Sequence, residues 1–294
     1  MEQTIAIGSF ARRVLVGARF GWVTAIFERS LYLDVNGDWI CLADPAVGCG
    51  PVTVSVEGRN GRGWVRRFSV GRLVKLTPAG ISLDDSPIIS IQGVSPWQPP
   101  PPPAWSKTSL ERGLDALESL TGAKIPTEGL SRFLLTFHNG LPATPESRAA
   151  ASPIEALENW LSEGFEASMP IPPGESVAAL VGLGPGLTPS GDDFLGGMLI
   201  ALHLCGKTTI RNQLFTQITP VLEHTGPVSR AHLQAAATGE GGEALHRVLN
   251  ALLAGDAVML ESAVGAIDRI GHTSGWDALA GAVTVLRNIA STVR

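Results

Sequence analysis

Five consecutive prolines, Pro99 to Pro103, constrain this chain more than any other feature, because they allow neither a helix nor a central strand to continue through them. They lie in the stretch SPWQPPPPPAW and favour a polyproline II segment. We interpret the segment as a stiff connector; the alternative is a docking segment for a proline-binding module. The predicted parts are a β-rich domain over 1–95, a proline-rich linker over 96–105 and a helical domain over 106–294.

The part before the prolines is typical of an antiparallel β domain. Asn36-Gly37 is a signal for a two-residue hairpin, because a type I′ turn needs a positive φ at both positions. On either side of it lie short β-branched or aromatic runs that are split by glycine. These predicted strand runs cover 13–27, 30–43, 51–58 and 63–76.

After the prolines, apolar residues recur at helical spacing. Leu214, Ile218 and Leu222, for example, fall on one face of a helix. This order of elements predicts the α+β class, with an N-terminal antiparallel β-rich domain followed by a C-terminal α-helical domain. The predicted helices cover 109–120, 152–167, 192–206, 210–225, 243–255, 256–270 and 276–292.

Composition and charge exclude several classes of function. The chain is 44% hydrophobic and 17% charged, which is too apolar for a disordered protein. Its net charge of −5 argues against a nucleic-acid partner, which requires a basic surface. The longest apolar run, Phe194–Cys205, contains His203 and falls short of the roughly 20 residues needed to cross a bilayer. We therefore expect neither a nucleic-acid partner nor a membrane partner.

The N-terminal residues and the cysteines favour a cytoplasmic location. Arg12, Arg13 and Arg19 interrupt any apolar core of a secretory signal. The three cysteines are odd in number and lack the spacing of a disulfide framework. Both observations predict a protein of the reducing cytoplasm.

The stretch GLGPGLTPSGDDF, residues 182–194, combines backbone freedom with two adjacent acids. Thr188 and Pro189 fit an N-cap followed by proline, and Ser190 with Asp193 fits a capping box, so a helix is predicted to begin here. The first turn of a helix offers unpaired N–H groups and the positive end of the helix dipole. The motif is neither a Walker loop nor a dinucleotide fingerprint, and it predicts a binding site for an anion.

A second segment repeats this pattern. SGDDFLGG begins at Ser190 and SGWDALAG begins at Ser274, and the two share Ser, Gly, Asp, Leu and Gly at the same spacing. We expect the two helix N-termini to converge on one pocket, with His272 and Thr273 just outside the second helix. The alternative is that each Ser and Asp only caps its own helix, at about 1 kcal/mol for each cap.

A further candidate lies in EHTGPVSRAHL, near another predicted helix start. Here Arg230, close to Thr225 and Ser229, could bind a carboxylate or a phosphate through two hydrogen bonds. The alternative is a surface arginine with no role in binding.

The first motif, followed by GHTSGWDALAG, resembles the signature of the AllH family, and the β-rich start GSFARRVLVGARFGWVTAIFERSLYL is part of the resemblance. Members of this family are similar to the H subunit of oxamate carbamoyltransferase, which acts with two other subunits in anaerobic allantoin breakdown, a branch of purine catabolism. That reaction exchanges a carbamoyl group between oxalurate and phosphate, giving oxamate and carbamoyl phosphate. The resemblance implies a transferase subunit that works with other carbamoyltransferase subunits.

The site residues are interpreted from chemistry, because the resemblance carries no residue-level mechanism. Every participant in such a transfer is anionic, so glycine amides, hydroxyls and an arginine are the expected binders of carbamoyl phosphate, oxamate or a similar metabolite. This substrate-binding set is Gly184, Gly186, Thr188, Ser190, Gly191, Thr273, Ser274, Gly275 and Arg230. The catalytic candidates are Asp192, Asp193, His272 and Asp277.

The adjacent acids Asp192 and Asp193 have three possible roles. They could point away from the anion as caps, hold a divalent cation such as Mg²⁺, or act as a base on the nitrogen nucleophile. Three functions stay open: a carbamoyltransferase subunit, a non-catalytic metabolite-binding or scaffold subunit, and a metal-assisted hydrolase of a carbamoyl or phosphate compound.

Overall fold

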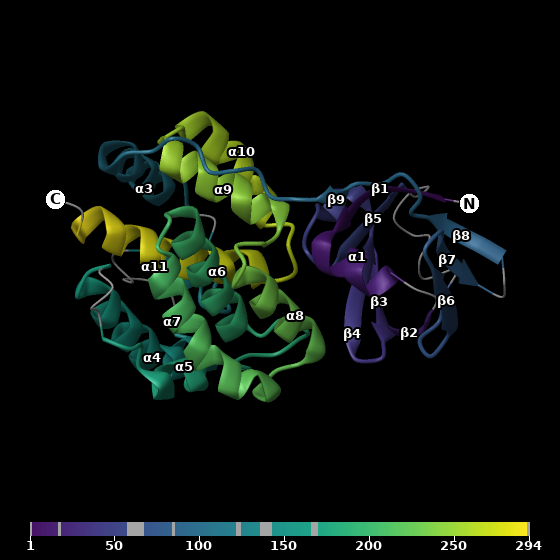
Figure 1. Ribbon diagram of the computed structural model, residues 1–294. Coiled ribbons are helices and arrows are strands. Elements are labelled where there is room, and N and C mark those ends of the chain that lie inside the picture. Colours follow the sequence, from purple (N-terminus) through teal and green to yellow (C-terminus); the bar gives the residue numbers. More distant parts are fainter. Residues whose placement is uncertain are drawn as a thin grey trace. The chain divides into compact units, whose positions relative to one another are not determined.

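The chain divides into two compact units with separate hydrophobic cores. Contacts between Cα atoms assign Met1–Pro99 to the first unit and Pro100–Arg294 to the second (Figure 1). The first is mainly β and the second helical, which confirms the α+β class. The predicted limits of the two domains, at residues 95 and 106, stay a prediction. The computed structural model describes residues 2–16, 19–57, 68–83, 86–121, 125–135, 143–165 and 170–292.

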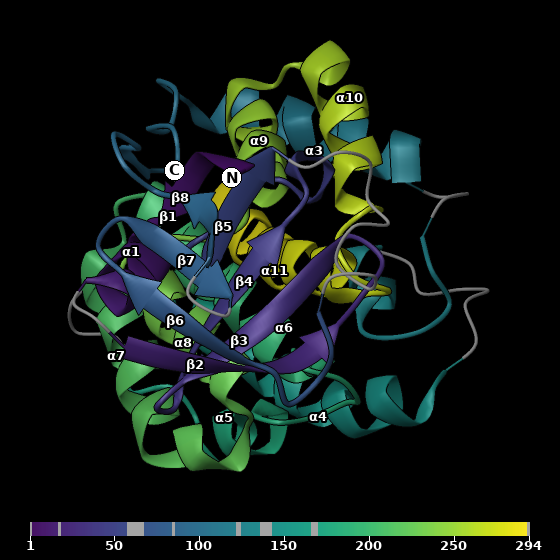
Figure 2. The ribbon, with the colours of Figure 1, turned by 90° about the vertical axis from the view of Figure 1, so that its right-hand side faces the viewer.

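One sheet forms the first unit. Its strands are β1 Glu2–Gly8, β2 Arg19–Ile26, β3 Ser30–Val35, β4 Asp38–Ala43, β5 Thr53–Glu57, β6 Leu73–Thr77, β7 Gly80–Leu83, β8 Ser86–Ser90 and β9 Pro96–Trp97. Hydrogen bonds join them in the order β5-β4-β3-β2-β6-β7-β8-β1-β9, and a further β1–β5 pairing closes the sheet on itself. In Figure 2 the strands from β5 to β8 follow one another around this ring.

Most of these pairings are antiparallel, as predicted. The β3–β4 hairpin turns at Asn36-Gly37, whose φ angles are 57° and 91°. Three pairings are parallel, namely β1 with β8, β1 with β9 and β4 with β5. In β3, burial alternates along the strand and places Leu31, Leu33 and Val35 in the core.

The predicted strand over 13–27 is wrong in its first three residues. Residues Ser9–Leu15 form the helix α1, in which Ala11, Val14 and Leu15 are buried at helical spacing. The strand itself begins at Arg19. In the predicted strand 63–76, residues 63–67 lie outside the described part of the chain, and β6 begins at Leu73.

The second unit is helical from Lys107 onward. The helix α5 was not predicted, whereas α8 begins at the helix start expected in EHTGPVSRAHL. The predicted helix 210–225 changes to a 3-10 turn at Thr219, where Pro220 supplies no N–H for an α-helical bond. Its elements are α3 Lys107–Thr121, η2 Ser131–Leu134, α4 Pro145–Ser162, α5 Gly174–Leu180, α6 Ser190–Leu204, α7 Thr208–Ile218, η3 Thr219–His224, α8 Pro227–Ala236, α9 Glu243–Ala254, α10 Ala257–Ile267 and α11 Ser274–Thr292.

Helices α6 and α11 form the centre of this unit. They pack directly against each other, and α11 also contacts α3, α9 and α4. Figures 1 and 2 both show α11 surrounded by these helices. Most residues of both helices are buried, which explains why their apolar residues form nearly continuous runs. None of the described helices combines the length and the apolar character required to cross a membrane.

Candidate functional site

The two sequence motifs meet at the starts of α6 and α11. Thr188, just before α6, and Ser274, the first residue of α11, have their hydroxyl oxygens 2.9 Å apart. The residues lie 86 positions apart in the sequence. This contact confirms the prediction that the two helix N-termini come together.

The serines and aspartates of the two motifs pair reciprocally. Ser190 of α6 stands beside Asp277 of α11 and lowers its pKa, and Ser274 of α11 does the same for Asp193 of α6. Each serine is the first residue of its helix and each aspartate is the fourth. The repeated spacing therefore builds a local two-fold arrangement in which each motif completes the other.

The first glycine of each motif packs on the helix that precedes it. At Gly191, a Cβ atom would overlap the carbonyl oxygen of Leu180, the last residue of α5. At Gly275, a Cβ atom would lie 2.6 Å from the carbonyl oxygen of Ile267, the last residue of α10. Both glycines are required for close packing, so their direct role in binding stays a prediction.

The last glycine of each motif packs on the partner helix. A Cβ atom at Gly197 would overlap the carbonyl oxygen of Ala278 in α11, and one at Gly281 would overlap that of Phe194 in α6. Ala278 and Phe194 hold the same place in the two motifs, four residues after the first serine. The two-fold arrangement thus extends along both helices, and packing explains why the glycines recur.

The predicted side-chain caps of α6 are wrong. The helix begins at Ser190 with Pro189 in the N-cap position, and no side chain caps it. Ser190 and Asp193 face Asp277 and Ser274 of α11 instead. The amide of Gly191 donates to the carbonyl of Leu183 at 2.9 Å, and those of Asp192 and Asp193 donate to the carbonyl of Pro189. Hydroxyls and carboxyls therefore supply much of the polar chemistry at this helix start.

Asp192 is a buried carboxylate whose contacts tie α6 to its neighbours. Its Oδ1 accepts a hydrogen bond from the amide of Gly182 at 2.9 Å. Its Oδ2 accepts from the hydroxyls of Thr225 at 2.5 Å and Ser229 at 2.6 Å. Burial raises the pKa of Asp192, and these three donors oppose the rise by stabilising the charged form. Thr225 and Ser229, noted in the sequence beside Arg230, thus belong to this anchoring contact.

Asp277 is the most deeply buried acid of the site, with no exposed surface. Burial raises its pKa from 3.8 to about 6, against hydrogen bonds from the amide of Leu130 and the hydroxyls of Ser190 and Thr273. The Leu130 amide donates to Oδ1 at 2.6 Å. Its Oδ2 is buried and has no well-formed hydrogen bond within the described residues. Asp277 can therefore exchange a proton near neutral pH.

Asp193 faces α11 and is partly exposed as a residue, although its Oδ2 is buried without a hydrogen-bond partner in the described part of the chain. Burial raises the pKa of Asp193 well above its ordinary value, and the negative charge of Asp277 raises it further. The hydroxyls of Ser274 and Thr188 act in the opposite direction. Asp193 and Asp277 together are called the carboxyl pair below.

A segment far away in the sequence covers Asp277. Residues 125–135 contribute the Leu130 amide, and the carbonyl oxygens of Phe133 and Leu134 accept hydrogen bonds from Arg287 of α11. Two side chains of α11 thus hold both ends of η2. Sequence reasoning missed this segment because its contribution comes from backbone atoms, which leave no side-chain motif to find.

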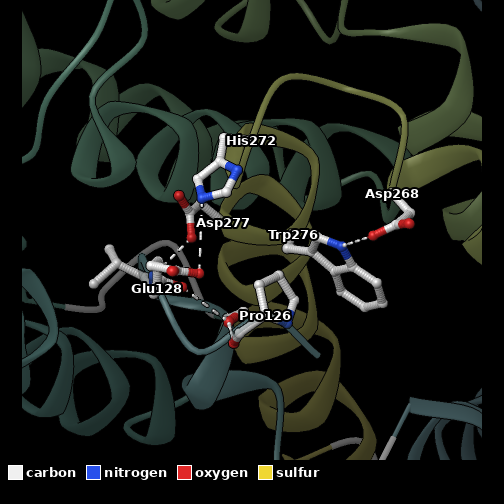
Figure 3. A network of polar contacts seen from close by, with 8 residues as sticks. Pro126, Glu128, Asp268, His272, Trp276 and Asp277 are labelled. Carbon is white, nitrogen blue, oxygen red and sulfur yellow. Dashed lines mark hydrogen bonds and ion pairs between the residues drawn. The ribbon is translucent and has the colours of Figure 1, made fainter. Parts of the chain in front are cut away.

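The predicted histidine lies at the surface. His272 is 83% exposed, and its Nε2 lies 3.7 Å from a carboxylate oxygen of Glu128. Figure 3 shows His272, Glu128 and Asp277 close together, with Trp276 turned the other way toward Asp268. His272 therefore borders the covering segment, and its catalytic role stays a prediction.

The remaining predicted binders lie around this cluster. Gly184 and Gly186 have φ angles of 115° and 95°, and Gly186 is exposed with open space where a side chain would stand. Thr188 and Thr273 are both partly exposed, so the cluster borders solvent on this side. Arg230 forms an ion pair with Glu223, in which its Nη1 lies 2.7 Å from the carboxylate Oε2.

The residues do not form a recognisable metal centre. Within the described ranges, no group of three or more His, Cys, Asp and Glu side chains is arranged to hold a metal ion. Both oxygens of Asp192 already accept hydrogen bonds. The Mg²⁺ predicted for Asp192 and Asp193 therefore stays a prediction that lacks a complete set of protein ligands.

Comparison with known proteins finds one family model that matches the part of the chain containing this site. A family model described as "Oxamate carbamoyltransferase subunit AllH" matches residues 180–286, a range that contains both motifs and the whole carboxyl pair. The match confirms the resemblance seen in the two motifs and relates the chain to a carbamoyltransferase subunit. No solved structure matches the chain.

Proposed function

We propose that this chain is a subunit of a carbamoyltransferase and that the carboxyl pair, with the hydroxyls beside it, binds a small anionic metabolite such as oxamate or carbamoyl phosphate. The family match supports the class of reaction. The observation that carries the site is the pair of buried acids at the meeting point of α6 and α11, since each keeps an Oδ2 atom without a well-formed hydrogen bond. Packing explains the glycines and serines, but it does not require two unsatisfied buried oxygens.

Asp277 is proposed as the proton acceptor. In the direction that forms oxalurate, the amide nitrogen of oxamate attacks the carbamoyl carbon of carbamoyl phosphate, and phosphate leaves with the electron pair of the broken C–O bond. The attacking nitrogen must lose a proton, and ionised Asp277 could accept it. Its pKa of about 6 leaves it ionised at pH 7 yet basic enough for this step.

The surrounding groups would orient the anion. The starts of α6 and α11 present the positive ends of two helix dipoles, which favour a negatively charged ligand. The partly exposed hydroxyls of Thr188, Thr273 and Ser274 could donate to its oxygen atoms. Without a ligand, the hydroxyls of Thr188 and Ser274 pair with each other, and the three hydroxyls lower the pKa values of the neighbouring acids.

A second function is a scaffold or metabolite-binding subunit without catalysis. The occupied amides of Gly191, Asp192 and Asp193 favour it, because they leave fewer donors to stabilise an oxyanion. In both cases we infer that the chain works with other carbamoyltransferase subunits in purine catabolism. A cytoplasmic location is also proposed, supported by the free thiols of Cys41 and Cys205.

The test is an assay of oxalurate formation from oxamate and carbamoyl phosphate, first with the purified chain and then with co-encoded carbamoyltransferase subunits. Asp277→Asn keeps the shape and the acceptor for Leu130 but cannot take up the proton. We expect it to lower turnover at least about 100-fold while the complex still assembles. The control is Gly196→Ala, because a Cβ atom there finds its nearest neighbour at 3.9 Å. Full turnover by the complex with Asp277→Asn would refute the catalytic role of Asp277 and favour the scaffold function.

A further inference from the structure

Arg287 holds one end of the segment that covers Asp277. Both residues lie on α11, with Arg287 nearly three helical turns further along. Its guanidinium donates to the carbonyl oxygens of Phe133, at 3.4 Å, and of Leu134. A guanidinium presents its donors in a rigid planar fork, so it can fix the positions of two acceptors at once. Arg287 therefore fixes the C-terminal end of η2.

The other end of η2 presents its backbone to Asp277. Leu130 is the N-cap residue of η2, and its amide donates to Oδ1 of Asp277 at 2.6 Å. Gly129 before it has a φ of 68°, and a Cβ atom there would lie 2.5 Å from the same oxygen. The hydroxyl of Ser131 donates to the carbonyl of Pro126 at 2.8 Å and so closes the turn around Gly129. The turn thus holds the backbone against the carboxyl group so closely that only glycine fits.

A short and well-packed piece of chain joins these two contacts. The η2 turn has four residues, and the side chains of Leu130 and Leu134 at its two ends are buried in the helical core. Arg287 in turn lies near the carboxylates of Glu118 in α3 and Glu158 in α4, which favour its charged form. A closely packed piece of this kind transmits a displacement from one end to the other. A continuous chain of contacts therefore runs from Arg287 through η2 to the carboxyl group of the site.

The position of the Leu130 amide matters because Asp277 is surrounded by groups that disfavour its charge. Burial raises the pKa of Asp277, and the acid Glu146 adds to the rise. Asp193, the other member of the carboxyl pair, is a further acid beside it. Among the groups that oppose the rise, the Leu130 amide has the largest effect, and two hydroxyls follow it. An amide that moved away would leave the carboxylate less stable.

We propose that Arg287 is a positioning residue for Asp277 and acts through η2, by holding the Leu130 amide against the carboxylate. The inference rests on the proposed function for the catalytic role of Asp277. It adds a residue that acts on this role from nearly three helical turns away.

The test measures the pKa of Asp277 in the purified chain, so it needs neither a ligand nor a partner subunit. Urea denaturation from pH 4 to 9 compares Asp277 with Asp277→Asn in each background. The difference in free energy of unfolding changes with pH and levels off above the pKa of folded Asp277. Arg287→Met should raise this pKa by about one pH unit, because a hydrogen bond to a charged group is lost. Arg287→Lys keeps the charge without the fork and should raise it by at least about half as much.

Two further variants serve as control and as second test. Arg247→Met removes a cation whose ion pair with Glu243 lies within α9, and it should leave the pKa of Asp277 unchanged. Gly129→Ala displaces the covering segment from its other end and should raise the pKa of Asp277, as Arg287→Met does. This second variant keeps the test decisive if Arg287→Met fails to fold.

The assay of oxalurate formation in the complete complex then separates this inference from the proposed function. With Arg287→Met, turnover should fall about fivefold at pH 6 and recover as pH rises, whereas with Asp277→Asn it should stay low throughout. An unchanged pKa of Asp277 in Arg287→Met and Gly129→Ala would overturn the inference. So would a wild-type pKa in Arg287→Lys beside a raised one in Arg287→Met, since charge alone would explain it. A raised pKa with unchanged turnover would support the inference and refute only the catalytic role of Asp277.

Discussion

The starts of α6 and α11 share a sequence pattern, yet they differ at its third position. Asp192 occupies this position in α6 and is held by Thr225 and Ser229, near the start of α8. Trp276 occupies it in α11, and its Nε1 donates to Asp268 at 3.2 Å, just after α10. The comparison teaches that the shared serine, aspartate and last glycine join the two helices to each other, whereas the third position, like the shared first glycine, anchors each helix to a neighbour of its own.

The largest expected effect breaks the shared interface itself. Gly197→Ala would force a methyl group into the carbonyl oxygen of Ala278, and the two central helices would have to separate. We expect a loss of about 3 kcal/mol or more in the free energy of unfolding, measured by urea denaturation. The neighbouring Gly196→Ala has room and should be neutral or slightly stabilising. Equal stability of the two variants would refute the close packing.

The next effect is a pH dependence of stability that distinguishes Asp277 from the rest of the interface. A carboxyl whose pKa rises from 3.8 to about 6 on folding contributes stability that is present below about pH 4 and lost as pH rises through 6. The loss amounts to about 3 kcal/mol. Asp277→Asn has no carboxyl group to ionise, so its free energy of unfolding should rise relative to that of wild type between pH 4 and 7. Denaturation curves at several pH values measure this difference. A stability difference that does not vary over this range would contradict the burial of an ionisable group here.

A smaller effect tests the anchoring role of the third position. Asp192→Ala leaves three donors without their acceptor, and we expect a loss of about 2 kcal/mol in thermal or urea unfolding. Ser229→Ala removes one of these donors and should cost less. If Asp192 only anchors α6, oxamate affinity in the folded variant should stay within about twofold of wild type. A tenfold loss of affinity would place Asp192 in the binding site.

The smallest effect concerns the exposed edge of the second motif. His272→Ala removes a side chain that is 83% exposed, and its carboxylate neighbour Glu128 is 58% exposed, so solvent screens their interaction. We expect no measurable change in Tm. Turnover should fall less than in Asp277→Asn, and a larger fall would instead make His272 the main proton carrier of the site.

The sequence by itself determined the local structure well. The proline run, the Asn36-Gly37 hairpin and the helical spacing of apolar residues depend on neighbouring residues, so the α+β class could be predicted from them. The repeated Ser-Gly-x-Asp pattern also predicted that α6 and α11 meet, because two copies of one pattern indicated a shared environment. It could not show that each serine would pair with the aspartate of the other helix.

Tertiary structure alone decided what each acid does. Asp192 and Asp193 are adjacent in the sequence, but successive residues of an α-helix point about 100° apart, so they face different neighbours. Asp192 meets hydroxyls near α8, while Asp193 meets α11. The Leu130 amide reaches Asp277 from 147 residues away. A pKa depends on the burial and the charges that folding brings together, and no local pattern of residues contains that information.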